Sequence, residues 1–345
     1  MKIPASFRDQ KAHAAELRFK LAQWFRLNGR DLPWRRSPDP YAVMVSEFML
    51  QQTQVVTVIA YFERWLKRFP DFNTLAAASE EEVMHVWQGL GYYSRARNLH
   101  RAAKCVVDEH GGQLPDDPAA IARLPGVGRY TAGAIASFGF DQAAAAVDAN
   151  IARVLARLGN LREPIDARAG SDALWAMASD LLPESGGREH TSALMELGAL
   201  VCLPRKPHCA LCPVRDYCAA PDPELLPVKK PRRASVRIDE NCAWIVEAGA
   251  LLLEQQSGTR WRGLWKLPAL NGESLGEPLF KIEYPFTHHV VTLRVYGKSA
   301  EAELMPGQRW FAFKELAGAA FAAAHRRALV ALLPLHGLPA SLLDS

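Results

Sequence analysis

Four of the six cysteines lie within one short stretch, in the spacing C-x6-C-x2-C-x5-C: Cys202, Cys209, Cys212 and Cys218. Four thiolates gathered in one loop suit either a tetrahedral zinc ion or an iron–sulfur cube, and the spacing alone does not separate the two. The chain begins with charged residues where a signal peptide needs an uninterrupted apolar stretch, so we expect it in the cytoplasm. In that compartment a cysteine cluster predicts a metal site rather than disulfides.

A glycine-rich turn precedes a helical pattern at Leu124–Ile135, which reads LPGVGRYTAGAI. Gly126 and Gly128 allow the backbone to turn sharply. The helix that follows presents unpaired N–H groups and the positive end of its dipole. This arrangement predicts a cradle for a phosphate group.

Two carboxylates stand beside helical patterns. Asp148 directly precedes the pattern that runs through Ile151 and Leu158, where an N-cap carboxylate accepts backbone N–H groups. We expect Glu47 to open a second helix within Ser46–Gln54, where capping is the default role. Taken singly, each residue is interpreted as a structural cap. Together they are the minimum needed to cleave a glycosidic bond, because one carboxyl protonates the leaving group and the other stabilises the sugar cation.

The spacing of apolar residues is helical from about residue 12 to residue 220. Val55, Ile59 and Phe62 illustrate the pattern, with steps of four and three. Clusters of Gly and Pro divide this region into many short helices, and no strand alternation is present. The sequence therefore predicts an all-α domain over residues 1–220, which includes the cysteine loop 202–218.

Residues 221–237 combine four prolines with a basic run, a composition typical of an exposed tether. Strand-like runs rich in branched and aromatic residues follow this tether and begin at Cys242, Ala250, Gly263 and His289. An Ala-rich helix is expected near 315–333. Residues 238–345 are thus predicted to form a smaller α+β domain.

Length and composition agree with this division. A chain of 345 residues favours two domains. Hydrophobic residues make up 49% and charged residues 23%, which excludes disordered, collagen-like and coiled-coil classes. No apolar run reaches the roughly 18 residues that a membrane span needs, so no membrane partner is expected. The net charge of +4 permits a polyanionic partner without requiring one.

The order and intervals of these motifs resemble a known superfamily. The L-P-G-V-G-R-Y turn, the V-D-A-N stretch around Asp148 and the cysteine loop resemble the helix-hairpin-helix DNA glycosylases with an iron–sulfur loop. Three further stretches resemble the adenine DNA glycosylase (MutY) family within it: Leu32–Arg35, Ser46–Gln54 and Gly89–Leu99. The resemblance covers most of residues 20–220. It implies that the four cysteines hold one four-iron, four-sulfur (4Fe-4S) cluster.

The resemblance implies an enzyme that removes adenine mispaired with 8-oxoguanine, or with guanine, from double-stranded DNA. The base is flipped into a pocket, Glu47 protonates it and later helps to activate water, and Asp148 stabilises the sugar cation. Tyr130 and Asn150 are implied to hold Asp148 in place. Bifunctional relatives carry at the position of Tyr130 a lysine whose amine attacks the sugar. Tyrosine there implies a monofunctional enzyme that leaves an abasic site.

Contacts with the DNA are also implied by the resemblance. Tyr92 is expected to intercalate beside the lesion, because stacking of its ring compensates for the base stacking that is lost when the adenine is flipped out. Leu50 and Gln52 are expected near the space that the adenine vacates. Arg30 and Arg35 are expected to line the approach to the pocket.

The second domain resembles a MutT/Nudix-like fold through Gly263–Pro268, which reads GLWKLP. It lacks the Glu-rich helix with which such hydrolases bind magnesium, so nucleotide hydrolysis is not expected. Phe286, Thr287 and His288 match the family's Phe-Ser-His loop with threonine in place of serine, which implies that this domain recognises 8-oxoguanine. In the first domain His190–Ser192 departs from the family, which more often has Phe-Asn followed by Gln or Glu.

Two other functions compete with this interpretation. One is a glycosylase for oxidised pyrimidines of the endonuclease III type, which Tyr130 and the second domain disfavour. The other is a non-catalytic iron–sulfur protein that binds DNA, which the presence of both Glu47 and Asp148 disfavours. A monomer is the expected state.

Overall fold

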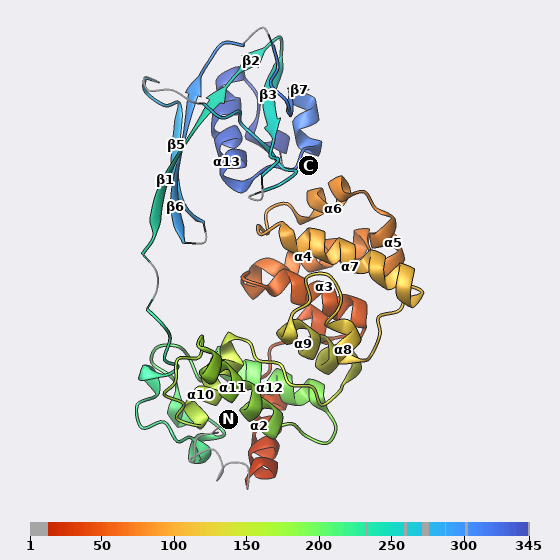
Figure 1. The fold of residues 1–345 in the computed structure, drawn as a ribbon, viewed down its shortest axis with the longest axis vertical. Coiled ribbons are helices and arrows are strands. Elements are labelled where there is room, and N and C mark those ends of the chain that lie inside the picture. The colour runs from red at the N-terminus through yellow and green to blue at the C-terminus, as the bar shows by residue number, and fades with distance from the viewer. Residues whose placement is uncertain are drawn as a thin grey trace. The chain divides into compact units, whose positions relative to one another are not determined.

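The computed structural model describes residues 13–231, 234–258, 261–270, 276–286, 288–300 and 303–343. Contacts between residues divide the chain into two compact units (Figure 1). The first unit consists of Met1–Ala77 and Asn98–Pro231, and the second of Ala78–Arg97 and Arg232–Ser345. Each unit has a hydrophobic core of its own.

All regular elements among the described residues of the first unit are helices, which confirms the predicted all-α class. Its α-helices are α2 (Ala14–Asn28), α3 (Pro40–Leu50), α4 (Val55–Arg68), α5 (Phe72–Ala77), α8 (Pro118–Ile121), α9 (Arg129–Phe140), α10 (Ala149–Leu158), α11 (Arg168–Asp180) and α12 (Gly187–Leu200), together with α7 (Ser94–His110) from Asn98 onward. Its 3-10 helices are η1 (Pro33–Arg35), η2 (Cys209–Leu211), η3 (Arg215–Tyr217) and η4 (Pro223–Leu225). Within the part of the chain that the structure describes, no helix has the length and apolar character needed to cross a membrane.

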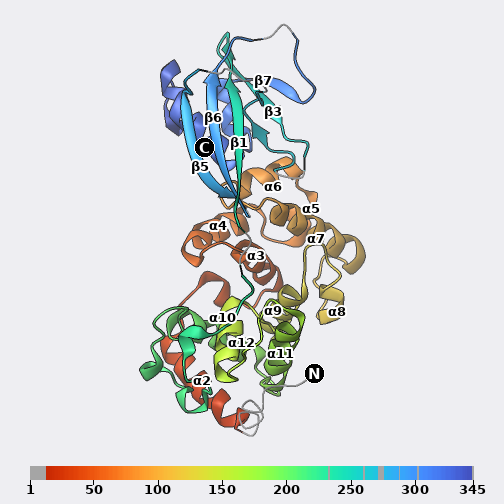
Figure 2. The ribbon, with the colours of Figure 1, turned by 60° about the vertical axis from the view of Figure 1, so that its left-hand side comes forward.

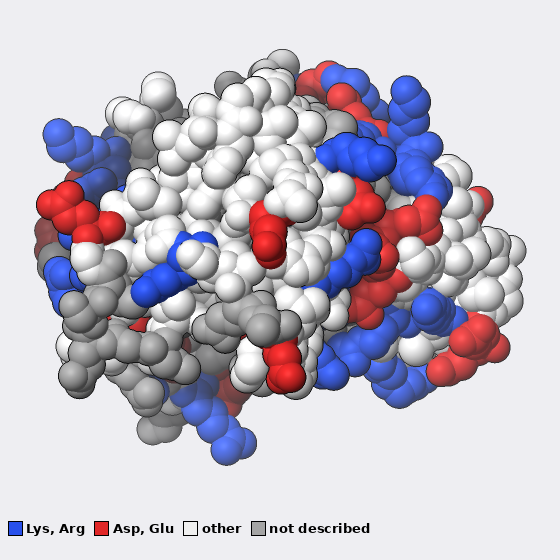
Figure 3. Space-filling view, turned by 90° about the horizontal axis from the view of Figure 1, so that it is seen from above, with Lys and Arg blue, Asp and Glu red and all other residues white. Residues whose placement is uncertain are grey.

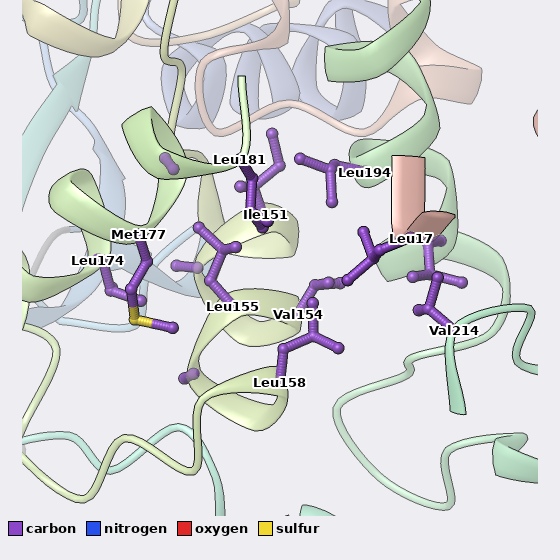
Figure 4. Close-up of a cluster of buried hydrophobic side chains, with 14 of the residues drawn as sticks. Leu17, Ile151, Val154, Leu155, Leu158, Leu174, Met177, Leu181, Leu194 and Val214 are labelled. Atoms are coloured by element: carbon purple, nitrogen blue, oxygen red, sulfur yellow. The ribbon is translucent and has the colours of Figure 1, made fainter. Parts of the chain in front are cut away.

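The apolar stripe of α10 lies in the core of the first unit (Figure 4). Ile151, Val154, Leu155 and Leu158 recur at helical spacing, and all four are buried. Side chains from α2, α11 and α12 pack against this stripe, and Val214 joins them from the cysteine loop. Because each buried aliphatic side chain contributes about 1.5–3 kcal/mol, this packing anchors the helix that Asp148 precedes.

The helix that carries Glu47 begins earlier than expected. α3 starts at Pro40, and the carboxylate of its N-cap, Asp39, accepts the N–H of Tyr41 at 3.0 Å. Glu47 therefore lies well inside α3, and the expectation that it opens a helix within Ser46–Gln54 is wrong. The reason is that Asp39 and Pro40 together supply a cap and a proline at the first helical position, where no N–H is needed.

The starts of α9 and α10 agree with the sequence. Asp148 is the N-cap of α10, and its carboxylate accepts the N–H of Ile151 at 2.7 Å. The glycine turn lies between α8 and α9, with Gly128 as the N-cap of α9. The predicted helix, hairpin and helix are thus confirmed as local structure.

The second unit is an α+β structure with two sheets (Figures 1 and 2). Its strands are β1 (Val236–Trp244), β2 (Val246–Glu247), β3 (Ala250–Gln255), β4 (Trp265–Lys266), β5 (Phe280–Phe286), β6 (His289–Gly297) and β7 (Gln308–Ala312). β6 pairs in parallel with β1 and antiparallel with β5, whereas β3 pairs antiparallel with β2, β4 and β7. Its helices are α6 (Glu80–Trp87), η5 (Phe313–Gly318), α13 (Ala323–Leu332), η6 (Leu333–His336) and η7 (Ala340–Leu343). The predicted α+β class is confirmed.

Details of the second unit differ from the expectation. The helix expected near 315–333 is α13, which begins only at Ala323, because Phe321 is extended and forms a bridge to Trp265. β5 and β7 have no counterpart among the strand-like runs of the sequence. β5 contains Pro285 and alternates exposed with half-buried residues, so its apolar signal is weak.

The region expected as a tether divides between the two units. Residues 221–231 belong to the first unit, where Leu226 is buried and its carbonyl accepts from Arg157 at 3.0 Å. Ile165 donates its N–H to the carbonyl of Val228 at 3.0 Å. β1 then begins at Val236.

The second unit also takes in residues 78–97, which the helical periodicity alone places in the first domain. The Tyr93 hydroxyl donates to the carbonyl of Phe321 at 3.1 Å. Arg97 donates to the carbonyl of Arg262 at 2.7 Å. These long-range bonds tie the segment to the C-terminal region.

Candidate active site

A cavity of about 660 Å³ opens in the first unit. Its wall includes ten residues to which the sequence analysis gave a role: Glu47, Asp148, Tyr130, Asn150, Arg30, Arg35, Leu50, Gln52, Gly126 and Gly128. A pocket of this volume is large enough to enclose a small molecule. The structure thus brings both candidate carboxylates to one cavity.

Glu47 is buried on α3, with 4% of its surface exposed, and its Oε2 accepts a hydrogen bond from the Tyr130 hydroxyl at 2.8 Å. Burial raises the pKa of Glu47 to about 7, because the hydrogen bond from Tyr130 and the cation of Arg35 only partly oppose it, and Asp148 adds to the rise. Burial also raises the pKa of Tyr130, so its hydroxyl remains a donor. A carboxyl with a pKa near 7 can hold a proton at neutral pH and transfer it to a bound group.

Both oxygens of the Asp148 carboxylate accept hydrogen bonds. Oδ1 accepts from the N–H of Ile151 at 2.7 Å, and Oδ2 accepts from Nδ2 of Asn150 at 2.9 Å. Burial raises the pKa of Asp148, and these two donors oppose the rise because they favour the anion. The positive end of the α10 dipole acts in the same direction. The site therefore places a carboxyl whose hydrogen bonds favour its ionised form beside a protonatable acid.

Arg153 holds Asn150 in place, and the sequence analysis missed it. Its Nη2 donates to Oδ1 of Asn150 at 2.9 Å and to the carbonyl of Gly198 at 2.7 Å. Its Nε donates to the carbonyl of Cys202 at 2.7 Å. A Cβ on Gly198 would lie 2.6 Å from Cβ of Asn150, so only glycine permits this close approach. The sequence alone does not show that Arg153 is buried, because an arginine in an amphipathic helix usually lies on the exposed face.

The glycine turn has the geometry of an anion cradle. Gly126 has φ +77°, and a Cβ there would lie 2.5 Å from Cβ of Asn98, so the fold requires glycine twice over. A Cβ on Gly128 would meet nothing within 4 Å, so packing within the protein does not explain this glycine. The first N–H groups of α9 have no partner within the helix and can bind an anion in that space.

Arg30 and Arg35 line the cavity as expected, and both bind a residue that the sequence analysis missed. Nη2 of Arg30 and Nη2 of Arg35 donate to Oε1 of Glu196 at 2.7 Å and 3.0 Å. Glu196 lies on α12, lines the same cavity and is completely buried. No short motif marks this contact, because 166 residues separate Arg30 from Glu196.

The residues expected to contact the DNA base stack share an unusual backbone. Gln52 and Tyr92 have φ of +58° and +47°, in the left-handed region that costs a non-glycine residue on the order of 1 kcal/mol. Gln52 and Leu50 line the cavity, whereas Tyr92 belongs to the second unit and is 47% exposed. The buried Arg95 supports the loop of Tyr92 by donating to the carbonyl of Gly91 at 3.1 Å.

The cysteine loop has the donor set of an iron–sulfur site. Burial raises the pKa of the Cys212 thiol to about 11, and repulsion by the other three cysteine sulfurs adds to the rise. Among the described residues, no three of these sulfurs lie within 4.8 Å of one another. One tetrahedral zinc ion would hold its sulfurs about 3.8 Å apart, whereas a cube with one thiolate per iron needs a wider spacing. Arg157 donates to Sγ of Cys202 at 3.2 Å, as suits a cluster ligand. The residues fit a 4Fe-4S cluster.

A second group of metal-type side chains lies in the second unit: Glu240, Cys242 and His325. Nδ1 of His325 accepts the N–H of Leu267 at 3.2 Å, and its Nε2 lies 3.5 Å from Oε1 of Glu240. Because an accepting Nδ1 leaves the ring proton on Nε2, this nitrogen faces Glu240 as a donor and not as a metal ligand. The group is therefore interpreted as a polar link between β1 and α13.

The residues expected to recognise 8-oxoguanine lie at the turn between β5 and β6. Phe286 ends β5 and His288 is exposed, whereas Thr287 lies outside the described residues. The ring of Trp261 lies 5.8 Å from that of Phe286 and 6.0 Å from that of Tyr284. Trp261 thus supports Phe286, although no sequence motif indicated it.

The stretch that departs from the family lies in α12. Of its three residues, Ser192 lines the cavity with a short hydroxyl. Oγ1 of Thr191 and Oγ of Ser137 lie 2.8 Å apart, which directs Thr191 towards α9. Burial lowers the pKa of His190 to about 4, so its ring is neutral.

One face of the molecule carries charged side chains of both signs. On the face drawn in Figure 3, Lys and Arg side chains lie among Asp and Glu around a largely uncharged area. Backbone N–H groups such as those of the glycine turn are candidates for binding phosphate that do not depend on side-chain charge.

Two family models match the chain, one over a long helical stretch and one over the cysteine loop. Residues 45–177 match the HhH-GPD superfamily of base excision DNA repair proteins. Residues 202–218 match the iron–sulfur binding domain of endonuclease III. The first match spans the cavity-lining Glu47, Tyr130 and Asp148.

Known proteins resemble the chain over most of its length. It is 34% identical over 407 residues to the adenine DNA glycosylase of Homo sapiens, covering 93% of this chain and 74% of the human protein. A solved thermostable thymine-DNA glycosylase aligns with a TM-score of 0.55 and 28% identity, over 61% of this chain and 97% of that protein. A trapped endonuclease III–DNA covalent intermediate aligns with a TM-score of 0.52 and 23% identity, over 61% and 95% of the two chains. The last likeness concerns the fold alone.

Proposed function

Since the chain belongs to the adenine DNA glycosylases of the HhH-GPD superfamily, we propose that its substrate is adenine mispaired with 8-oxoguanine or guanine in double-stranded DNA. Membership makes it a DNA glycosylase of base excision repair with a 4Fe-4S cluster. The observation that carries the proposal is the pair of carboxyls on one cavity, the buried Glu47 and the half-buried Asp148. Their different environments separate an acid from a fixed anion, as cleavage of a glycosidic bond requires.

In the proposed reaction Glu47 donates its proton to a ring nitrogen of the flipped adenine, because adenine leaves poorly as an anion. The glycosidic bond breaks, and its electron pair goes to the adenine, which leaves as a neutral base. Water then adds to the sugar and gives its proton to the Glu47 carboxylate. This last transfer restores the acid.

Asp148 stabilises the positive charge that develops on the sugar. The hydrogen bonds from Ile151 and Asn150 orient its carboxylate before the substrate arrives, so no reorganisation is needed during the reaction. Arg153 in turn fixes Asn150. The four cysteines, by this proposal, hold the cluster that braces the loop to which Arg153 bonds.

The product of the proposed reaction is an intact strand with an abasic site. Strand cleavage by bifunctional relatives needs an amine that attacks the sugar. Here the corresponding residue is Tyr130, whose raised pKa keeps its hydroxyl protonated and whose hydrogen bond goes to Glu47. We therefore propose a monofunctional enzyme. We also propose that the protein acts as a monomer.

The remaining proposed contacts serve to hold the DNA. The N–H groups after Gly126 and Gly128 bind a phosphate, since the space at Gly128 is open. Leu50 and Gln52 occupy the space near the flipped base, as their place in the cavity wall supports. Tyr92, with its exposed ring, stacks beside the lesion.

Incubation with an adenine:8-oxoguanine duplex, with and without later alkali, tests this function. We expect strand breaks only after alkali, because a monofunctional enzyme leaves the backbone intact. An adenine:guanine duplex should also break only after alkali, and an adenine:thymine duplex should not break. Breaks without alkali would indicate a lyase of the endonuclease III type. No breaks under either condition would indicate a protein that binds DNA without cleaving it.

Substitution of both Phe286 and His288 by alanine should reduce the preference for 8-oxoguanine over guanine by roughly tenfold, since a lost contact costs about 1–3 kcal/mol. Adenine excision opposite guanine should persist, because both residues lie outside the unit that holds the cavity. Single-turnover rates on the two duplexes measure the ratio. Leu279→Ala, at an exposed residue just before β5, is the matched control.

An unchanged ratio in the double variant would contradict this assignment and move lesion recognition to Tyr92 and its neighbours. Point substitutions are preferable here to removal of the C-terminal region. Tyr93 and Arg97 bond to that region, so its loss would disturb the loop that presents Tyr92.

A further inference from the structure

Glu196 makes the densest set of charged contacts on the cavity wall. Its carboxylate accepts from Nε and Nη2 of Arg30 at 3.0 Å and 2.7 Å, and from Nη2 of Arg35 at 3.0 Å. The backbone N–H of Arg30 also points to it, at 3.3 Å. Nη1 of Arg35 donates to the carbonyl of Arg30 at 3.1 Å, which closes the network.

The location of this network sets it apart from a surface ion pair. The side chain of Glu196 is 1% exposed, against 39% for Arg30 and 21% for Arg35. All three residues line the cavity that holds Glu47 and Asp148. A buried carboxylate is tolerated only where its charge is paired and hydrogen bonded. The two guanidiniums therefore stabilise the Glu196 carboxylate, and the carboxylate in turn fixes the positions of the two guanidiniums.

We propose that Glu196 is a positioning residue for adenine excision: it fixes Arg30 and Arg35 against the wall of the base pocket and offsets one of their two positive charges. The inference rests on the proposed function, because it assigns Glu196 to the pocket in which adenine would bind. Planar guanidiniums held in this way present donors in a preorganised geometry.

The charge balance matters for the acid. Groups that face Glu47 come from four elements: Tyr130 of α9, Asp148 before α10, Arg35 of η1 and, through Arg35, Glu196 of α12. Arg188 also lines the cavity from α12. The cation of Arg35 lowers the pKa of Glu47, against the larger effect of burial. An Arg35 without its anionic partner would favour the Glu47 carboxylate more strongly, and the acid would lose its proton at a lower pH.

Glu196 itself stays ionised in this setting. Burial alone would raise its pKa, but the hydrogen bonds from Arg30 and the charges of Arg35 and Arg30 outweigh burial, and the pKa lies below its ordinary value. The negative charge is therefore present throughout the neutral range. Its removal by substitution is a clean change of one charge.

The test compares Glu196→Gln, Glu196→Asp and the wild type in single-turnover excision on an adenine:guanine duplex across a range of pH. We expect Glu196→Gln to lower the rate at neutral pH by roughly tenfold or more, because misplaced binding groups cost rates of that order. The alkaline limb of its pH–rate profile, where the rate falls as Glu47 loses its proton, should also move to lower pH. Glu196→Asp keeps the charge and should restore the position of the limb, even if the shorter side chain leaves the rate reduced.

A matched control lies on the same helix. Glu189 of α12 pairs with Arg26 of α2 at 2.7 Å on the exposed surface, outside the cavity lining. Glu189→Gln removes an ion pair between the same part of the chain and α12 but should leave both the rate and the pH profile unchanged. Thermal melting of all variants records any loss of stability.

The outcomes separate the two levels of the argument. A wild type that removes no adenine would contradict the proposed function itself. If the wild type is active, the position of the alkaline limb in Glu196→Gln decides. An unshifted limb would show that Glu196 is only structural and would overturn this inference. This holds whether the rate of the variant is normal, or is lower at every pH together with a lower melting temperature. If Glu196→Gln does not fold, the Glu196→Asp variant decides. Because this variant keeps the negative charge, an alkaline limb that moves in it would contradict a role through charge.

Discussion

Replacement of Asp148 by asparagine is expected to reduce single-turnover adenine excision by roughly two to three orders of magnitude, the usual effect of removing one preorganised electrostatic group. The substitution removes the negative charge that faces the developing sugar cation and changes little volume. Binding to the duplex should stay within a few-fold of the wild type, because Asp148 is a half-buried residue of the cavity wall and touches no phosphate in the proposed complex. Gel-shift and single-turnover measurements on one preparation check both parts.

The same experiment discriminates between catalysis and capping. Asparagine caps a helix about as well as aspartate, so a purely structural Asp148 predicts almost normal turnover in the variant. Asp39→Asn, at the exposed N-cap of α3, is the matched control and should be nearly silent. Normal excision by Asp148→Asn would show that this residue is merely a cap.

Part of this site could be predicted from local sequence because local rules determine it. The turn before α9 needs glycine at Gly126 for a positive φ, and Asp148 precedes a strongly amphipathic helix. Both features are recognisable within a window of about ten residues. The fold classes of the two regions follow from periodicity in the same way.

Glu47 shows where local rules fail. Its helix is buried on nearly all sides, so the apolar run around it contains no boundary signal. The true start lies at Asp39 and Pro40, before the apolar run. The side chain still reaches the cavity, because its place on the inner face of α3 does not depend on where the helix begins.

Residues that act over long distances in the chain could not be predicted from sequence. Glu196 meets Arg30 across 166 positions, and Arg153 meets Cys202 across 49. Both are charged residues in amphipathic helices, where the usual expectation is an exposed face. Only the packing of α12 against α2 and α10 reveals that they are buried within the site.

The assignment of Glu47 as the acid makes a prediction that depends on pH. With a pKa of about 7, Glu47 should lose its proton as the pH rises through neutrality, so wild-type excision should fall on the alkaline side of that value. Glu47→Gln cannot donate a proton and should be slower by roughly a hundredfold or more across the range. It should also lack the alkaline limb, because the titrating group is gone.

Tyr130→Phe provides the companion test, since it alters the pKa of Glu47 without removing the carboxyl. The hydrogen bond from Tyr130 stabilises the Glu47 carboxylate, so its loss should raise the pKa of Glu47 and move the alkaline limb to higher pH. This direction is opposite to that expected for Glu196→Gln, in which an unbalanced Arg35 favours the carboxylate. If Tyr130→Phe moves the alkaline limb to higher pH and Glu196→Gln moves it to lower pH, Glu47 is identified as the titrating acid. An alkaline limb that survives in Glu47→Gln would assign the proton transfer to another group.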